Sequence, residues 1–362
     1  MLLLSISSFC VAEQIFVSVA GDDESEGSFE KPLRTLYIAA KKSQPGDTVY
    51  IREGEYRETL APTRSGEAGK PIIFSRYKNE KVVINAEHRR QGIMLWGVSY
   101  ITVRGLHVTG ANRAGIHLHH AMDSPSRSAS HIVIENNNVY ENQSHGIYMA
   151  GMHNVVKGNS VSNNGRQDPE GRAKGHGVYV LGEHQSVIGN RVESNYRLGI
   201  RITGSNQKVQ NNLVRKNGEH GIGVWIDGGQ TGENITIADN WIKHNERGEI
   251  VIDGAGKGSK PDNLSIKNNR IEDSEGEGLV LRNGLGLVRV EGNTFEGFFE
   301  NYLFIDSQSG RLATSGLNSF RGSGSFKYYG QRYESLDHLQ RRTGLESGST
   351  HSTVVSSLSG GI

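Results

Sequence analysis

The chain has 362 residues, of which 47 are glycine and only 7 are proline, and its formal net charge is +1 at pH 7. So small a net charge produces no global field that would favour nucleic acid or a membrane surface as a partner. No apolar run is long enough to cross a bilayer, so we expect no membrane span.

The first segment, residues 1–12, has the pattern of a signal peptide. An apolar stretch over residues 2–11 is followed by the small residue Ala12 and by polar Glu13, as a secretory cleavage site requires. The alternative is a buried N-terminal strand. We expect a secreted or periplasmic protein whose mature chain lacks Cys10, the only cysteine, so that disulfides play no part in its stability.

Short strands and one helix are predicted next. Residues 15–19, 48–51 and 72–75 alternate as strands. Residues 35–43 have helical spacing through Leu36, Ala39 and Ala40, and the pattern stops at Pro45.

An asparagine recurs through the middle of the chain, with an apolar residue three positions before it and another two positions after it. Its copies are Asn137, Asn159, Asn190, Asn212, Asn240, Asn269 and Asn293. A second asparagine follows each of the first five copies by five residues, at Asn142, Asn164, Asn195, Asn217 and Asn245. A period of roughly 20 to 30 residues indicates stacked supersecondary units.

Another short strand, of the type Gly-Ile-x-Val, lies between the asparagine copies. It recurs at residues 115–118, 146–149, 177–180, 199–202, 221–224, 249–252 and 278–281. Several short strands per turn, with Asn and Gly at the corners, are typical of a parallel β-helix. Asparagine tolerates the left-handed backbone of a corner, and stacked amides can bond from turn to turn. We therefore predict an all-β fold, a single-stranded right-handed parallel β-helix (solenoid) over residues 13–310.

The C-terminal part changes character after Asp306, where the repeats fade. Ser335 as N-cap, apolar Leu336 and Leu339, and Gly344 predict a short helix. Because a solenoid must close its apolar ends, we assign this helix to a C-terminal cap (residues 311–345) and the helix at residues 35–43 to an N-terminal cap. Residues 346–362, rich in Ser, Gly and Thr, are predicted to be a disordered tail.

Three N-terminal stretches resemble the start of secreted right-handed β-helix proteins of the pectate-lyase-like superfamily. They are residues 16–18, 32–36 and 45–58, and the last contains Pro-Gly-Asp-Thr-Val-Tyr-Ile-Arg-Glu-Gly. With the repeats, the resemblance covers about residues 15–306, and the segment at residues 335–344 is similar to the one that closes many of these proteins. The resemblance implies polysaccharide lyases, mannuronan C5-epimerases or glycoside hydrolases, because one fold hosts many chemistries.

Strand parity predicts which side chains face solvent. Since Ile147 and Met149 face the core, Tyr148 faces outward. The same parity gives an outward column of His117, Tyr148, Tyr179, Arg201 and Gly223, and beside it a column of His119, Ala150, Leu181, Thr203, Trp225 and Asp253. With rungs about 4.8 Å apart, these residues form a continuous stripe. Ordinary solvated surface is the alternative interpretation.

Longer connections flank this stripe, at residues 166–174 before the strand and at residues 120–130, 226–233 and 254–262 after it. A groove along a solenoid suits an extended polymer better than a small metabolite. We expect the partner to be an extended acidic polysaccharide and the protein to be a monomer.

Three histidines, His145, His176 and His220, share the position just before the strand glycine. They can be a ladder that satisfies the turn. Alternatively, one of them is a general acid or base, with His176 beside the long insertion as the first candidate.

β-Elimination on a uronate needs a cation for the carboxylate, a base for the C5 proton and an acid for the leaving oxygen. Arg201 can bind the carboxylate, and Tyr148, Tyr179 and His176 can transfer the protons. The expected substrate-binding residues are His117, His119, His145, His220 and Trp225. C5-epimerisation needs almost the same set. It is disfavoured because the Asp-Pro-His signature of many mannuronan epimerases is absent.

Hydrolysis would need two carboxylates, for which Asp227, Glu249 and Asp253 beside Trp225 are the candidates. Residues 175–177 and 199–202 resemble polygalacturonase motifs, although Thr203 stands where a lysine belongs. The same few carboxylates leave Ca²⁺ open as a cofactor without indicating it, and no metal site is predicted. A non-catalytic polysaccharide-binding β-helix is the third alternative to the preferred lyase.

Overall fold

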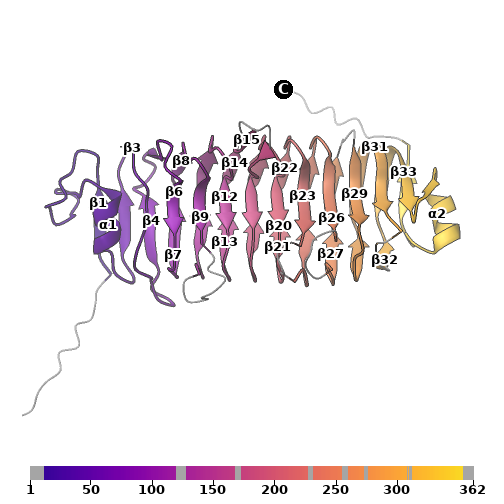
Figure 1. Cartoon of the computed structure of the whole chain (residues 1–362), viewed down its shortest axis with the longest axis horizontal. Helices are drawn as coiled ribbons and strands as arrows, with labels where there is room; N and C mark the ends of the chain where they lie inside the picture. Colours follow the sequence, from indigo (N-terminus) through magenta and orange to yellow (C-terminus); the bar gives the residue numbers. More distant parts are fainter. Residues whose placement is uncertain are drawn as a thin grey trace, which may run out of the picture.

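The computed structural model describes residues 12–119, 128–167, 173–226, 231–254, 260–272, 276–307, 309 and 312–353. These residues coil into one elongated stack of parallel strands (Figure 1). The predicted signal peptide lies almost wholly outside the described residues. Neither of the two helices in the described part of the chain is long and apolar enough to span a bilayer.

The first row of the stack is a parallel sheet of twelve described strands. They are β1 (Gln14–Val17), β2 (Thr48–Ile51), β4 (Ile72–Arg76), β7 (Ile101–Arg104), β10 (Val133–Glu135), β13 (Val155–Lys157), β18 (Ser186–Ile188), β21 (Lys208–Gln210), β24 (Thr236–Ala238), β27 (Leu264–Lys267), β30 (Val288–Glu291) and β32 (Leu312–Gly316).

The second row follows the same order along the axis. It comprises β3 (Gly54–Tyr56), β5 (Val82–Asn85), β8 (His107–Thr109), β11 (Asn138–Tyr140), β14 (Ser160–Ser162), β19 (Arg191–Glu193), β22 (Leu213–Arg215), β25 (Trp241–Lys243) and β28 (Arg270–Glu272).

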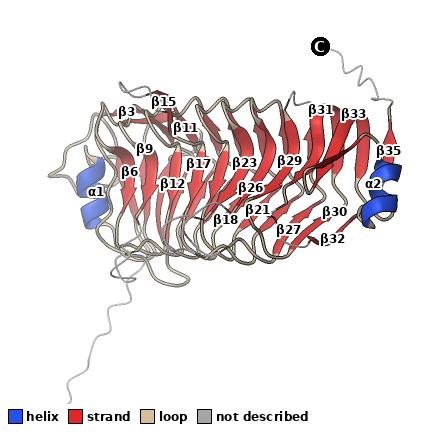
Figure 2. Cartoon of the chain, turned by 45° about the vertical axis from the view of Figure 1, so that its right-hand side comes forward, coloured by secondary structure: helices blue, strands red, loops and turns tan. Residues whose placement is uncertain are grey.

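The third row carries the predicted stripe. It comprises β6 (Gln91–Leu95), β9 (Ala114–Leu118), β12 (Ile147–Met149), β17 (Val178–Val180), β20 (Ile200–Ile202), β23 (His220–Trp225), β26 (Gly248–Asp253) and β29 (Glu277–Arg282). The long strands β31 (Thr294–Ile305) and β33 (Ser319–Tyr328) pair with one another and continue both rows, since β31 pairs with β28 and with β29. The stacked layers are visible in Figure 2.

The core is a continuous column of inward aliphatic side chains. In each short strand of the third row the middle residue points outward and its two neighbours are buried, as in Ile147–Met149. β-Branched residues dominate these inward positions, where they pack well on a pleated surface.

The asparagine columns line the corners inside the stack. Asn190 is buried; its side-chain nitrogen donates to Val156 O at 2.9 Å and to Asn212 Oδ1 at 3.0 Å. Its own Oδ1 accepts from the backbone nitrogen and the side-chain nitrogen of Asn159, both at 2.9 Å. Each amide therefore satisfies polar groups on the turns before and after it, and this fixes the register.

The residue that precedes these ladder asparagines takes up the left-handed backbone of the corner. Asn136 and Asn211, directly before Asn137 and Asn212, have φ of 55° and 57°. The ladder residue itself is thus free to turn its amide inward.

The helix α1 (Leu36–Lys42) lies at the β1 end of the stack and α2 (Leu336–Thr343) at the other (Figure 1). Leu36, Ala39 and Ala40 of α1, and Leu336 and Leu339 of α2, are buried in the common core cluster. That these helices serve as caps stays a prediction.

The coil extends past the expected boundary at residue 310. β33 continues the stack, and β35 (Thr350–Ser352) pairs with it in parallel. Glu346 is fully buried and accepts a hydrogen bond from the side chain of Asn318 at 2.9 Å. The segment expected to begin a disordered tail is therefore ordered as far as residue 352.

Candidate functional site

The outward column of the third row is in register from strand to strand. His117 lies opposite Tyr148, Tyr148 opposite Tyr179, and Tyr179 opposite Arg201. All four are half-buried, with their flanking residues inside the core. The side chains therefore form one stripe on the outer surface.

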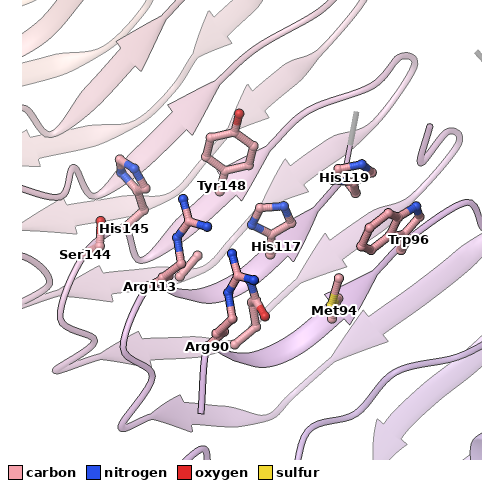
Figure 3. A pocket seen from close by; sticks show the side chains of 11 residues that line it. Arg90, Met94, Trp96, Arg113, His117, His119, Ser144, His145 and Tyr148 are labelled. Carbon is pink, nitrogen blue, oxygen red and sulfur yellow. The ribbon is translucent and has the colours of Figure 1, made fainter. Parts of the chain in front are cut away.

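A cavity of about 440 Å³ opens on this stripe near the N-terminal end of the row (Figure 3). Its lining comes from β6, β9, β12 and the residues next to them. The lining residues are Arg90, Gln91, Met94, Trp96, Arg113, Ala114, His117, His119, Ser144, His145 and Tyr148. No aspartate or glutamate occurs among these described lining residues.

Two arginines supply the positive charge of the cavity. Arg90 immediately precedes β6 and Arg113 immediately precedes β9, and the backbone nitrogen of Arg113 donates to Arg90 O at 3.0 Å. The two side chains therefore start one rung apart, and Figure 3 shows both reaching into the cavity. Guanidinium groups so placed can bind a carboxylate with planar, charge-assisted hydrogen bonds.

His117 and Tyr148 are neighbouring titratable groups that line the cavity. Their rings stack with centroids 4.7 Å apart and an interplanar angle of 11°. Desolvation, reinforced by His119, Arg113 and Arg90, lowers the pKa of His117 to about 4. Desolvation raises the pKa of Tyr148. At neutral pH His117 is thus an uncharged proton acceptor and Tyr148 a protonated donor.

An exposed indole borders the cavity. Trp96 is 53% exposed, and its ring packs on His119 with centroids 4.2 Å apart. A large aromatic side chain held open to solvent beside polar groups is suited to binding the flat apolar face of a sugar ring.

Tyr179 and Arg201, predicted to be catalytic, lie on the next two rungs and do not line the cavity. The guanidinium of Arg201 lies over the Tyr179 ring at 4.9 Å and near the Trp225 ring at 5.9 Å. These residues continue the stripe away from the cavity.

The three histidines before the strand glycines form a partly stacked row. His145 and His176 stack at 5.3 Å, and the backbone nitrogen of His176 donates to Nδ1 of His145 at 3.1 Å. His176, the first catalytic candidate, is only 2% exposed. Of the three, His145 alone lines the cavity.

Desolvation is the main cause that lowers the pKa of each of these histidines: to about 3 for His145, to about 4 for His220, and well below its usual value for His176. All three are therefore neutral at physiological pH. Nδ1 of His176 and Nδ1 of His220 are buried without a hydrogen-bond partner among the described residues.

Of the carboxylates considered for hydrolysis, the two that lie among the described residues, Glu249 and Asp253, are both buried. Asp227 lies outside the described residues. Asp253 is buried and accepts from Arg282 Nε and from the Asn283 side chain, each at 2.8 Å.

Glu249 was expected on the outer face, and this expectation is wrong, because its side chain is fully buried. On the neighbouring strand its position is occupied by Gly221. A Cβ added at Gly221 would lie 2.7 Å from the side-chain nitrogen of Asn245, so a side chain at this position points toward that corner amide. Its carboxylate accepts from the backbone and the side chain of Asn245. Five residues after Asn269, where the second asparagine column would continue, the chain has Ser274. The carboxylate of Glu249 therefore takes the place of the next amide in that column.

Arg90, Arg113 and Trp96 were missed by sequence reasoning. A signal for the arginines was present, because Arg90, Arg113 and Arg197 all stand two residues before a strand glycine. A backbone ladder links that position across rungs, with Ser144 N donating to Arg113 O at 3.0 Å.

Two protein-family models match the sequence. The first, "Pel9A-like, right handed beta helix region", matches residues 15–195. The second, "Periplasmic copper-binding protein (NosD)", matches residues 172–335.

Curated relatives match shorter stretches. The uncharacterised protein YwoF of Bacillus subtilis is 39% identical over an alignment of 138 residues that covers 35% of this chain and 28% of YwoF. Pectate lyase PEL9 of Emericella nidulans is 34% identical over 79 residues, 21% of this chain and 19% of PEL9. The chain thus matches less than a third of the length of either relative.

Among solved structures, pectate lyase Pel9A superimposes with a TM-score of 0.65 at 18% identity, covering 85% of this chain and 80% of Pel9A. At this low sequence identity, the superposition shows a shared fold and nothing more. Together with the family model over half of the sequence, these matches show that the chain belongs to the Pel9A-like right-handed β-helix family.

Proposed function

We propose that this protein is a polysaccharide lyase that cleaves an acidic, uronate-containing polysaccharide by β-elimination. The observation that carries the proposal is the composition of the cavity, in which two arginines, three histidines and a tyrosine meet without a carboxylate among the described lining residues. Such a site attracts an anionic sugar and provides groups for two proton transfers.

Each step of β-elimination has a group in the cavity. Arg90 and Arg113 bind the uronate carboxylate and stabilise the negative charge that develops on it when the C5 proton leaves. Neutral His117 accepts that proton, the C4–O4 bond breaks as the C4–C5 double bond forms, and the Tyr148 hydroxyl protonates the leaving oxygen. Proton return from His117 to Tyr148, directly or through solvent, restores the starting state.

The stacked geometry favours this division of roles. Tyr148 and His117 are neighbours on adjacent strands, so both reach the same sugar ring from one side. The lowered pKa of His117 keeps the base unprotonated, and the raised pKa of Tyr148 keeps the acid protonated. His176, which is nearly inaccessible, then acts by supporting His145.

C5-epimerisation differs from β-elimination only in returning a proton to the opposite face of C5. A non-catalytic binding protein would use the same cations without turnover. Hydrolysis is disfavoured because it needs a pair of carboxylates at the bond that is cleaved. A polysaccharide substrate fits a secreted or periplasmic location, which the match to the periplasmic-protein family supports.

The test is to incubate the purified protein with pectate, alginate and glycosaminoglycans and to follow the ultraviolet absorbance of unsaturated uronate ends. A lyase yields absorbance together with new chain ends. New reducing ends without absorbance would indicate hydrolysis, an altered uronate ratio without cleavage would indicate epimerisation, and binding alone would indicate the non-catalytic alternative.

A parallel reaction in EDTA tests how the carboxylate is neutralised. If the arginines supply the positive charge, turnover of the active substrate persists after chelation. Loss of turnover that added Ca²⁺ restores would show that a metal ion, and not the arginine pair, performs this task.

A further inference from the structure

His145 is held in one orientation by its backbone and by the rings around it. Its carbonyl accepts a hydrogen bond from Gly115 N at 3.1 Å. Its ring stacks on that of His176, with centroids 5.3 Å apart. It also packs at an angle against the rings of Tyr148 and Tyr179, at 5.7 and 5.3 Å. Rotation of the imidazole would therefore disturb contacts on its own rung and on the next one.

Gly175 brings the backbone of the next rung close to His145. Its φ is 93°, in the region that favours glycine, and a Cβ at this position would lie 2.1 Å from Ser144 O. Because no side chain intervenes, the backbone nitrogen of His176 comes near enough to donate to Nδ1 of His145 at 3.1 Å. The next histidine of the row lacks such a bond, since Nδ1 of His176 has no partner among the described residues.

The hydrogen bond from His176 fixes the tautomer of His145. A backbone N–H can only donate, so Nδ1 must carry a lone pair, and the single proton of the neutral ring lies on Nε2. Desolvation, followed by the charge of Arg201, lowers the pKa of His145 to about 3, so the ring is neutral at physiological pH. Its one basic nitrogen is already occupied. His145 therefore cannot take up a proton without losing this bond.

Nε2 is the polar atom that His145 offers to a ligand. His145 is half-buried and lines the cavity (Figure 3), and the described part of the chain supplies no hydrogen-bond partner for this nitrogen. The backbone nitrogen of the preceding residue, Ser144, donates to Arg113 O at 3.0 Å. His145 thus follows directly on the position that pairs with Arg113. A carboxylate bound by Arg113 would lie beside an uncharged N–H donor.

We infer that His145 donates a hydrogen bond through Nε2–H to the carboxylate of the bound sugar, as an uncharged donor that takes no part in proton transfer. The class of ligand rests on the proposed function. A neutral donor orients the carboxylate without adding a charge to the two that the arginines supply. The proton transfers are left to His117 and Tyr148.

Two substitutions separate the ligand contact from the structural bond. The amide of asparagine is attached at Cγ, as Nδ1 is, so His145→Asn keeps an acceptor for His176 N and removes the donor. The amide of glutamine lies one bond further out, so His145→Gln keeps a donor near the place of Nε2 and loses the acceptor. The probes are galacturonate, mannuronate and glucuronate, because these monosaccharides contain no glycosidic bond that could be cleaved. Their binding is measured by NMR titration.

His145→Asn should weaken binding about tenfold to hundredfold, as expected for a lost hydrogen bond to a charged group, with a melting temperature near that of the wild type. His145→Gln should bind nearly as tightly as the wild type but unfold at a lower temperature. A purely structural role would reverse this order. His338→Asn, in an exposed part of α2, is the control and should change neither quantity.

Nitrogen-15 NMR of the labelled imidazoles tests the tautomer without any ligand. The signal pair that disappears in both His145 variants should be that of a neutral ring protonated on Nε2. Combining Arg113→Ala with His145→Asn tests the acceptor, because two donors to one carboxylate should give losses that are not independent. Independent losses would overturn the assignment to the carboxylate.

A proton on Nδ1, wild-type affinity in His145→Asn, or no binding of any of the three sugars by the wild type would overturn the inference. The outcome for the lyase proposal is separate, because the probes are bound without turnover. A protein that shows the expected pattern of affinities but yields no unsaturated product from polymers would refute the lyase proposal alone.

Discussion

The imidazole of His117 and the phenol ring of Tyr148 stack in parallel across adjacent strands, with centroids 4.7 Å apart. Burial desolvates both groups and moves their pKa values in opposite directions, downward for His117 and upward for Tyr148. Pairs of titratable groups separated in this way are typical of acid–base sites.

The pH profile of kcat/KM should reflect the separated pKa values of His117 and Tyr148. His117 must be neutral to accept a proton, so activity should fall only as the pH drops toward its pKa of about 4, and it should be flat through neutral pH. Initial rates at low substrate concentration across the pH range provide the measurement. An acid limb near the ordinary histidine value of 6.5 would show that another group is the base.

Replacing His117 by Asn should reduce kcat by about 10²–10⁴-fold, the usual contribution of a general base, with little change in the melting temperature. His338, an exposed residue of α2, offers the matched control, because His338→Asn touches no group of the cavity. Equal activity of the two variants would remove His117 from the mechanism.

Arg113→Ala should lower kcat/KM by about 10²–10³-fold, because a positioned cation is lost where charge develops. Arg113→Lys should restore part of the loss, since it keeps the charge but not the planar fork. Arg113 is exposed, so the midpoint of urea unfolding should not move. Arg289→Ala, an exposed arginine on β30, controls for a general loss of positive charge and should retain activity.

The fold was predictable because each rung repeats a local rule. An asparagine followed two residues later by a buried Val or Ile fixes both the corner and the parity of the next strand. Once Asn137 and Asn159 are aligned, the alignment of His117, Tyr148, Tyr179 and Arg201 follows. The C-terminal end was less predictable, since β31 and β33 merge two rows and lack the short repeat.

The position of the cavity was not predictable from the same rule. Arg90 and Arg113 start at the turn before a strand, and their long side chains reach residues in the middle of it (Figure 3). Parity describes which side of a strand a residue faces, but it does not describe how far a flexible arginine extends. The sequence interpretation therefore assigned carboxylate binding to Arg201, which lies three rungs beyond the rung of Arg113.

Three histidines with lowered pKa values should make the fold sensitive to acid. In the unfolded chain His145, His176 and His220 take up protons near 6.5, whereas in the folded chain they resist protonation to much lower pH. Below about 6.5 the unfolded state binds more protons, so the free energy of unfolding should fall as the pH falls, and above this value these groups should contribute no slope.

Urea unfolding at a series of pH values measures this slope, and His176→Asn should make it shallower between neutral pH and about pH 4.5. His338→Asn should leave it unchanged. A His176→Asn variant with the full wild-type slope would show that the acid sensitivity originates elsewhere.

Asn190→Ala should destabilise the protein by several kcal/mol. It leaves the buried backbone nitrogen of Asn159 without its acceptor and removes the side-chain donor to Val156 O and Asn212 Oδ1, and a buried group left unpaired costs about 1–3 kcal/mol. Asn138→Ala, on the outward face of the second row, should cost far less. Equal unfolding midpoints for the two variants would contradict the register of the ladder.

Replacing Glu249 tests whether its carboxylate has a structural or a catalytic role. Because its side chain completes the corner next to Asn245, Glu249→Ala should lower the unfolding midpoint. The change leaves the buried backbone nitrogen of Asn245 without its acceptor and removes one acceptor of the Asn245 side chain. Specific activity per folded molecule, measured well below the transition, should stay near the wild-type value. A stable variant without activity would instead place Glu249 in a carboxylate pair, and hydrolysis would then replace β-elimination as the better account of the site.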